Sequence, residues 1–309
     1  MLMVMKLNEI EAFVKIAECR TFTKAARELG ISQPAISRRI TLLESDLETR
    51  LFDRLRTGAR LTDSGCAFLP YAQRLLAMLR DGVSAVRDAD ATGQRSITLA
   101  IVGTLASTSL MARLQWFRRD HPGVRLLLQT ANSNGVSDLV RKGDADLGLR
   151  YFSDDSADFV SVEVDRERLV IARAPDSLLI PTHVKDASEL AHAPWVSFPI
   201  GTGSSGEPFA AVVERCLQRL GLDSAERIVI DSLTAQKRMI EADFGIGIVP
   251  RSAIAEEVRL GSLGVLDLDG FDESAPIFML HRTNAFMNAS LRQLVAVIAP
   301  GTFAGSSEA

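Results

Sequence analysis

The residues best suited to chemistry follow Gly30, in a segment whose apolar residues recur at helical spacing. That segment begins with polar and basic side chains: Ser32, Gln33, Pro34, Ser37 and Arg38. A glutamine carboxamide pairs with adenine, and an arginine guanidinium pairs with guanine, when a helix enters the major groove of DNA. The hydroxyl of Ser32 and the amides at the start of the helix suit a phosphate. This combination favours sequence-specific DNA binding.

Three predicted helices position these residues. The first covers about residues 7–18, the second ends at Gly30, and the third is capped by Ser32. Small and apolar residues fall where a helix-turn-helix needs them: Ala26, Gly30, Ile36 and Ile40. The alternative is a helical hairpin of an ordinary globular domain, with its arginines on a solvated face.

Basic residues continue beyond the third helix. A short hairpin is predicted around Thr57 and Gly58, and it would act as a wing on the minor groove or the DNA backbone. Its arginines and one lysine of the second helix complete the predicted DNA-binding set: Lys24, Arg54, Arg56 and Arg60. Residues 63–91 then predict a helix of roughly 40 Å. Its apolar stripe needs a partner.

The charge is distributed unevenly along the chain. The 309 residues carry a net charge of −4, but residues 1–62 hold 11 basic and 8 acidic side chains, a net charge of +3. The remaining residues therefore carry −7. A basic head on an acidic body is compatible with nucleic-acid binding by the head alone.

The same segment resembles a known family. The run TFTKAARELGISQPAISRRITLLESDLETRLFDRLRTGARLTDSG is similar to the winged helix-turn-helix of LysR-type transcriptional regulators, in which AA, SQPAIS, LE, LF, R and LT recur in this order. Glu48 departs from the pattern, because the family usually has glycine there. GDADLGL and FGIGIVP, further along the chain, also agree with the family.

The resemblance implies the domain organisation. Residues 1–62 would be the DNA-binding domain, residues 63–91 a linker helix that pairs antiparallel with another subunit, and residues 92–309 the effector-binding domain. The strands and helices that alternate after Arg95 agree with an α/β fold. The expected fold class is α/β: an all-α winged head and linker helix, then two lobes like a periplasmic binding protein. Lobe I would comprise about 92–164 and 267–300, and lobe II about 165–266.

The resemblance also implies the partners. These are double-stranded promoter DNA, a small-molecule effector held between the lobes, RNA polymerase, and copies of the same chain in a homodimer or homotetramer. An effector would shift an equilibrium between shapes of the assembly and so change the DNA bend or promoter occupancy. We expect a cytoplasmic protein, since no stretch is apolar and long enough to span a bilayer. We also expect no cofactor.

The predicted effector site gathers hydroxyls and one cation at strand ends. By resemblance, the loops after the first two strands of lobe I and the glycine-rich loop after residue 199 line the cleft. The predicted residues are Thr104, Ser107, Thr108, Ser133, Arg150, Ser197, Gly203, Ser204 and Ser205. Amides and hydroxyls at a helix start bind anions, so a carboxylate effector is favoured. The alternative for each hydroxyl is a simple helix cap.

A second function has to be weighed. Residues 201–206, GTGSSG, match G-x-G-x-x-G between a predicted strand and helix, and Asp231 ends the next predicted strand, as in an NAD-dependent enzyme. Prolines flank the glycines, and Asp231 lies 25 residues beyond Gly206 instead of about 20. We therefore expect a regulator and not an enzyme, with a dinucleotide enzyme or a small-molecule binding protein as the alternative.

Metal and nucleophilic chemistry find little support in the sequence. The 3 cysteines and 4 histidines are scattered, so they suggest no metal site. GTGSSG does not form a G-x-S-x-G elbow, and no serine or cysteine is tied to a histidine by spacing.

Overall fold

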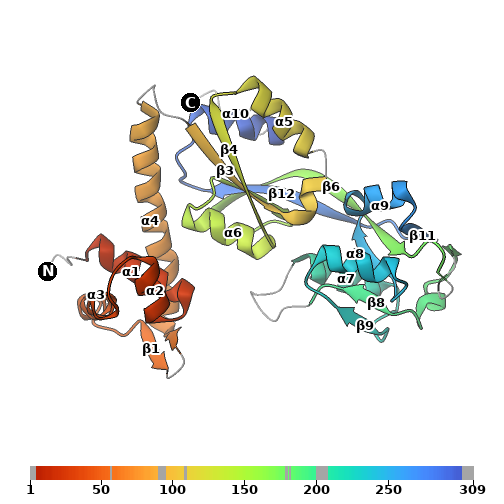
Figure 1. The fold of residues 1–309 in the computed structure, drawn as a ribbon, viewed down its shortest axis with the longest axis horizontal. Helices are drawn as coiled ribbons and strands as arrows, with labels where there is room; N and C mark the ends of the chain where they lie inside the picture. The colour runs from red at the N-terminus through yellow and green to blue at the C-terminus, as the bar shows by residue number, and fades with distance from the viewer. Residues whose placement is uncertain are drawn as a thin grey trace. The chain divides into compact units, whose positions relative to one another are not determined.

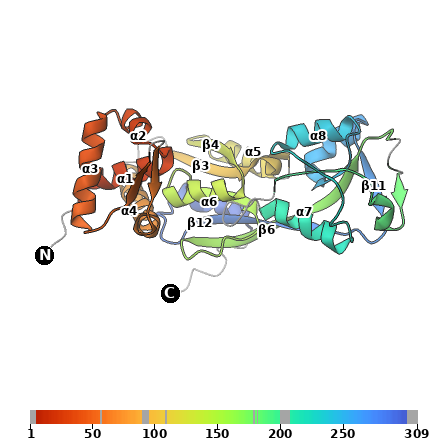
Figure 2. The same ribbon diagram turned by 90° about the horizontal axis from the view of Figure 1, so that it is seen from below.

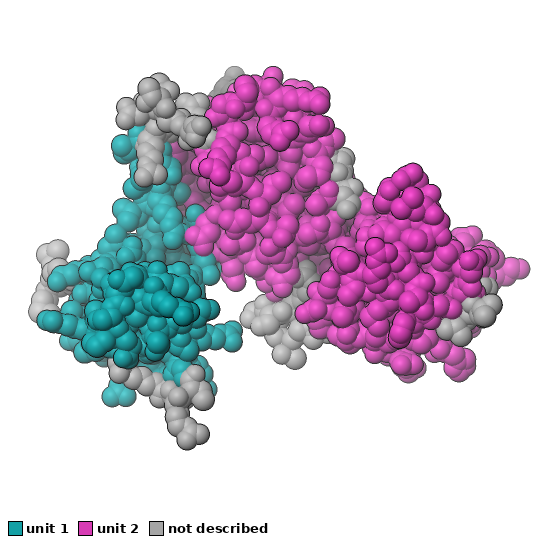
Figure 3. Space-filling view, viewed as in Figure 1, with its two compact units in different colours: residues 1–89, 141–143 teal, residues 90–140, 144–309 magenta. Residues whose placement is uncertain are grey.

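The computed structural model describes residues 5–55, 58–89, 95–107, 110–177, 180, 182–199 and 208–300. Two compact units divide the chain: residues 1–89 with 141–143, and residues 90–140 with 144–309 (Figure 3). In the described part of the chain, no helix is both long enough and apolar enough to cross a bilayer.

The first unit begins with three helices, α1 (Leu7–Cys19), α2 (Phe22–Glu28) and α3 (Gln33–Asp46), as the sequence predicts (Figure 1). Gly30 lies in the turn between α2 and α3 with a φ of +65°, a conformation that glycine adopts at low cost. The ring of Phe13 in α1 is buried, and its centroid lies 5.4 Å from that of Phe52 and 5.2 Å from that of Phe68. The head therefore has its own apolar core.

The hairpin and the long helix follow directly. Strands β1 (Phe52–Leu55) and β2 (Gly58–Leu61) pair antiparallel, and α4 runs over Asp63–Ala89. Thr62 caps α4: its Oγ1 accepts from the Gly65 amide at 3.0 Å and donates to the Arg50 carbonyl at 2.7 Å. This fixes the position of the hairpin on the start of the long helix.

The apolar residues of α4 differ in exposure along the helix. Phe68, Ala72 and Leu76 pack into the core of the head. A second set remains exposed along the helix: Tyr71, Leu75, Met78, Leu79, Val83 and Val86. We call these six residues the α4 apolar face. The stripe expected from the sequence is therefore covered by the head over part of its length and exposed over the rest.

Lobe I is an α/β layer in the second unit. Strand β3 (Arg95–Val102) lies between β4 (Val124–Ala131) and β5 (Leu147–Tyr151), all parallel, and β12 (Ser274–Arg282) pairs antiparallel with β5. Helices α5 (Leu110–Asp120) and α10 (Ala289–Ile298) contact each other on one face of this sheet, and α6 (Ser133–Lys142) covers the other (Figures 1 and 2). A Cβ on Gly148 would lie only 2.7 Å from Val136, so α6 packs closely on β5.

One strand belongs to both lobes. Strand β6 (Phe159–Arg173) pairs with β12 along its first part and with β10 (Gly247–Pro250) and β11 (Gly264–Leu268) along its last five residues. The expected lobe boundary at residue 165 thus falls inside this strand. Strand β11 belongs to lobe II, although lobe I was expected to resume at residue 267.

Lobe II is completed by smaller elements. Strand β7 (His183–Val184) pairs parallel with β11, and β8 (Trp195–Ser197) pairs parallel with β9 (Arg227–Val229). Its helices are α7 (Pro208–Arg219), α8 (Leu233–Glu241) and α9 (Ala255–Leu260). Strand β8, helix α7 and strand β9 form the strand–helix–strand unit that the sequence predicts around residues 201–206.

Replacing Glu48 by glycine should stabilise the head. Glu48 has a φ of +52°, the left-handed conformation that disfavours every residue with a Cβ. We expect E48G to raise the free energy of unfolding by about 0.5–1 kcal/mol, after the entropy cost of glycine in the unfolded chain. Amide hydrogen exchange in α3 should slow about twofold to fivefold. E48A keeps the strained backbone and should give no such protection; equal protection in both variants would show that strain is not the cause.

Candidate DNA-binding surface and ligand pocket

Helix α3 presents the predicted base-contacting residues to solvent. The hydroxyl of Ser32 accepts from the Ala35 amide at 3.3 Å and caps the helix. Gln33, Pro34 and Arg38 are exposed, and Ser37 is half-buried. The opposite face of α3 is held in the core by Ile36, Ile40 and Leu43. The exposed face is therefore rigidly positioned without using its polar side chains.

Two further basic residues, one on α2 and one on α3, differ in their contacts. Lys24 is exposed in the first turn of α2, where its amide donates to Thr21 Oγ1 at 3.2 Å. The guanidinium of Arg39 instead donates to the Asn8 carbonyl at 3.4 Å, so this arginine ties α3 to α1. Adjacent arginines on α3 thus differ: Arg38 is exposed, and Arg39 contacts the protein.

Three arginines were predicted in the wing, and the structure describes the side chain of one of them, Arg60. Arg60 lies opposite Asp53 in the hairpin, with Nη2 3.3 Å from Oδ2, and its side chain is 71% exposed. Such an exposed ion pair contributes at most about 1 kcal/mol, so a phosphate can displace Asp53. Arg56 and the side chain of Arg54 lie outside the described residues.

The carboxylate of Glu44 holds the wing to α3, a role that the sequence analysis missed. Its Oε1 accepts from the amides of Leu51 and Phe52 at 2.8 and 3.2 Å. These amides begin β1, so Glu44 fixes the wing relative to the base-contacting helix. The leucine–glutamate pair in the family resemblance was the available signal.

A pocket of about 420 Å³ lies between the lobes of the second unit. Its lining from lobe I comprises Val102, Gly103, Thr104, Ala131, Asn132 and Tyr151, and that from lobe II comprises Phe198, Pro199, Phe209, Asp231, Leu233 and Thr234. Pockets of this size hold small molecules. The volume and the mixed lining indicate a ligand site.

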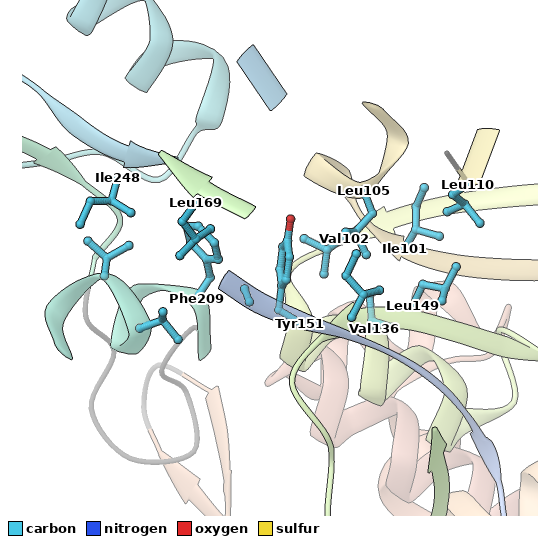
Figure 4. Close-up of a cluster of buried hydrophobic side chains, with 14 of the residues drawn as sticks. Ile101, Val102, Leu105, Leu110, Val136, Leu149, Tyr151, Leu169, Phe209 and Ile248 are labelled. Atoms are coloured by element: carbon cyan, nitrogen blue, oxygen red, sulfur yellow. The ribbon is translucent and has the colours of Figure 1, made fainter. Parts of the chain in front are cut away.

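Aromatic rings cross the pocket from one lobe to the other. Tyr151, at the end of β5, lies 5.1 Å from Phe209 between ring centroids, and Phe209 lies 6.4 Å from Phe198 edge to face. Figure 4 places the Tyr151 ring between Val102 and Phe209. Thr104 Oγ1 donates to the Tyr151 hydroxyl oxygen at 3.0 Å. The two lobes therefore meet through these rings.

The structure brings only part of the predicted effector set to this pocket. Thr104 lines it. Ser133 is buried in the first turn of α6, and its neighbour Asn132 lines the pocket instead. Ser197 precedes two lining residues, Phe198 and Pro199. The side chain of Ser107, and all of Thr108, Gly203, Ser204 and Ser205, lie outside the described residues.

Arg150 does not supply the cation expected in the pocket. It is 4% exposed, and its guanidinium donates to Asp154 Oδ2 at 3.0 Å and to Ser137 Oγ. Burial raises the pKa of Asp154, but hydrogen bonds from Ser137 and Ser156 and the charge of Arg150 lower it more, so the net pKa is below its usual value. Arg150 is therefore committed to a buried ion pair, and its neighbour Tyr151 lines the pocket.

Residues for metal chemistry do not gather in the described part of the chain. No group of three or more histidine, cysteine, aspartate or glutamate side chains there has the placement to hold a metal ion. Cys216 is buried, and this burial, with the charge of Glu273, raises the pKa of its thiol despite nearby arginines. A raised thiol pKa disfavours the reactive thiolate.

Sequence comparison gives two matching family descriptions. Residues 7–66 match "Bacterial regulatory helix-turn-helix protein, lysR family", and residues 90–301 match "LysR substrate binding domain". The transcriptional regulator CfxR of Cupriavidus necator is 28% identical over 272 residues, covering 87% of this chain and 83% of that protein. A RuBisCO operon transcriptional regulator of Allochromatium vinosum is 23% identical and covers 91% of each chain.

Solved structures agree in fold. The LysR family regulator CbnR superposes with a TM-score of 0.64 at 23% identity, covering 95% of this chain and 98% of CbnR. Full-length CbnR complexed with its target DNA gives 0.62 at 24% identity, covering 95% and 99%. Full-length BenM gives 0.56 at 24% identity, covering 95% of each chain.

Removing the Glu44 carboxylate should loosen the wing. In E44A, the amides of Leu51 and Phe52 lose their charged acceptor, at about 1.5–3 kcal/mol for hydrogen bonds to a charged group. We expect their hydrogen exchange, measured by nuclear magnetic resonance, to accelerate at least about tenfold. E11A removes an exposed carboxylate from α1 and should leave both rates unchanged. Unchanged exchange in E44A would mean that other groups protect these amides.

Proposed function

Because this chain belongs to the LysR family of bacterial helix-turn-helix transcriptional regulators, we propose that Gln33, Ser37 and Arg38 contact the bases of its operator. The observation that carries this proposal is the exposed polar face of α3, held by a fully buried apolar face. A helix fixed in this way loses little conformational freedom on entering the major groove. Ser32 and the first amides of α3 would contact a phosphate.

The wing and α2 would contribute contacts to the backbone. Lys24 is exposed, and Arg60 is held only by an exposed ion pair. We assign both to phosphate contacts, with Arg54 and Arg56 as further candidates from the sequence. Such contacts add affinity that falls with salt, but they do not select sequence.

The α4 apolar face supports association of two chains. Apart from the adjacent Met78 and Leu79, its six exposed side chains follow one another at intervals of three or four residues, the pattern of a helix that buries one face on a partner. Pairing of two such helices would place two heads on one operator. The higher assembly into a tetramer and a contact with RNA polymerase stay predictions.

The pocket is the proposed effector site. The aromatic contacts join the two lobes, which also share strand β6, so a ligand that inserts among the rings would change the closure of the lobes. A ligand that prefers one closure by ~1.4 kcal/mol would shift the ratio of the two shapes tenfold. We propose binding without conversion, since the described lining pairs no nucleophile with a histidine or lysine base.

Replacing Gln33 and Arg38 by alanine tests the DNA-contacting residues. Each bidentate base contact discriminates by about 1–3 kcal/mol, so Q33A/R38A should weaken operator binding at least about thirtyfold. The operator is a duplex selected from random sequence by the wild-type protein, and binding is measured at fixed salt by fluorescence anisotropy. R118A removes one exposed arginine from α5 and should bind normally. Retention of specific binding in the double variant would refute this assignment.

Introducing charged residues into the α4 apolar face tests whether two chains associate through it. Placing Asp at positions 79 and 83, as L79D/V83D, would bury unpaired carboxylates in a helix–helix interface, which costs several kcal/mol. We expect the mass measured by light scattering to fall by half or more at the same concentration. S84D adds one charge at an exposed polar position of α4 and should keep the wild-type mass. An unchanged mass in the double variant would place the subunit interface elsewhere.

A further inference from the structure

The charge of the pocket differs from what a carboxylate ligand requires. Among the lining residues that the structure describes, Asp231 supplies the only carboxylate, and none is lysine, arginine or histidine. The cation expected there, Arg150, is buried in its pair with Asp154. Residues 200–207, which follow Pro199 in sequence, contain no lysine, arginine or histidine. The described lining therefore offers an anionic ligand repulsion from Asp231 without a compensating cation.

Groups of the chain itself partly occupy the helix starts at the pocket. At α6, the Asn132 side chain already accepts from the Gly135 amide at 2.8 Å. At α8, the Ser232 hydroxyl accepts from the Ala235 amide at 3.4 Å. The first residue of α7 is Pro208, which has no N–H group. Internal caps thus occupy one amide at the start of α6 and one at the start of α8, and Pro208 offers none at the start of α7.

The remaining lining residues are mainly aromatic and aliphatic, which favours a ligand with a flat apolar ring. Tyr151, Phe198 and Phe209 supply three aromatic rings, and Val102 and Leu233 add aliphatic surface. Aromatic ligands pack on such rings, and the electron-rich faces also attract an ammonium group. The Thr104 hydroxyl donates a hydrogen bond to the Tyr151 hydroxyl oxygen, so both groups already satisfy part of their hydrogen-bonding capacity.

We infer that this pocket takes an aromatic amine, with its ring among Tyr151, Phe198 and Phe209 and its ammonium group toward Asp231. This inference rests on the proposed function of the pocket as the effector site, and it replaces the small carboxylate expected from the sequence. Asp231 is the specificity-determining residue: it attracts a cation and repels an anion of the same shape. Because Asp231 is exposed, solvent screens the effect, so it shifts affinity without excluding neutral ligands.

The test uses three probes that share a ring and chain: 3-phenylpropylamine, 3-phenylpropanol and 3-phenylpropanoate. Binding to the full chain is measured by calorimetry at low salt and neutral pH. We expect the amine to bind at least tenfold more tightly than the propanoate, with the alcohol between them. Equal affinity for amine and propanoate, tighter binding of the propanoate, or no binding of the amine at millimolar concentration would each overturn the inference.

Variants show whether Asp231 causes the preference. D231N should reduce the ratio of amine to propanoate affinity at least fivefold, and D231E should retain most of it. D223N removes the same charge after the far end of α7, outside the pocket lining, and should keep the wild-type ratio. A full preference in D231N would overturn the role of Asp231. Thermal unfolding without ligand confirms that each variant is folded.

Operator binding separates this inference from the proposed function. If the amine binds as expected but changes neither operator affinity nor DNA bend, the ligand class stands and the coupling fails. If the propanoate binds more tightly and changes operator affinity, the coupling stands and the ligand class is wrong.

Discussion

The continuous strand β6 is the constraint on which the effector domain depends. Its first part pairs with β12 in lobe I, and its last residues pair with β10 and β11 in lobe II. The two lobes cannot separate without breaking this backbone ladder, but they can bend about it. Buried Glu167 strengthens the same region, because its carboxylate accepts from both the amide and the hydroxyl of Ser252 at 3.1 and 3.0 Å. We therefore propose that a small rearrangement among the pocket rings changes the angle between the lobes.

The head follows a comparable principle, since its functional surface is positioned by residues that do not form it. The buried face of α3, the Gly30 turn and the Glu44 carboxylate fix the helix and the wing, which leaves Gln33 and Arg38 exposed. Pre-positioned side chains lose less entropy on binding than mobile ones. The −7 charge of the rest of the chain is compatible with contact to DNA through the +3 head alone.

The sequence predicted the helices of the head closely because local signals coincide there: the Ser32 cap, the Gly30 turn and the apolar spacing of α3. The sequence did not predict that β6 starts at Phe159, because charged residues interrupt the apolar pattern of its first part. That part forms a strand by pairing with β12. Around the pocket, two lining residues are neighbours of residues that the sequence selected: Asn132 beside Ser133, and Phe198 beside Ser197. Adjacent side chains of a strand point to opposite faces, so a shift of one position along the strand changes which side chain faces a cavity. The aromatic contacts join three distant segments, and only the tertiary fold brings them together.

In the proposed function, paired α3 helices enter the major groove of one operator. Dimethyl sulfate protection tests it most directly, because the reagent modifies guanine N7 in the major groove. We expect two protected clusters of guanines on one face of the duplex, separated by a whole number of turns of about 10–10.5 base pairs, as two symmetric heads require. Protection confined to a single cluster, or an absence of major-groove protection on a tightly bound operator that contains guanines, would contradict it.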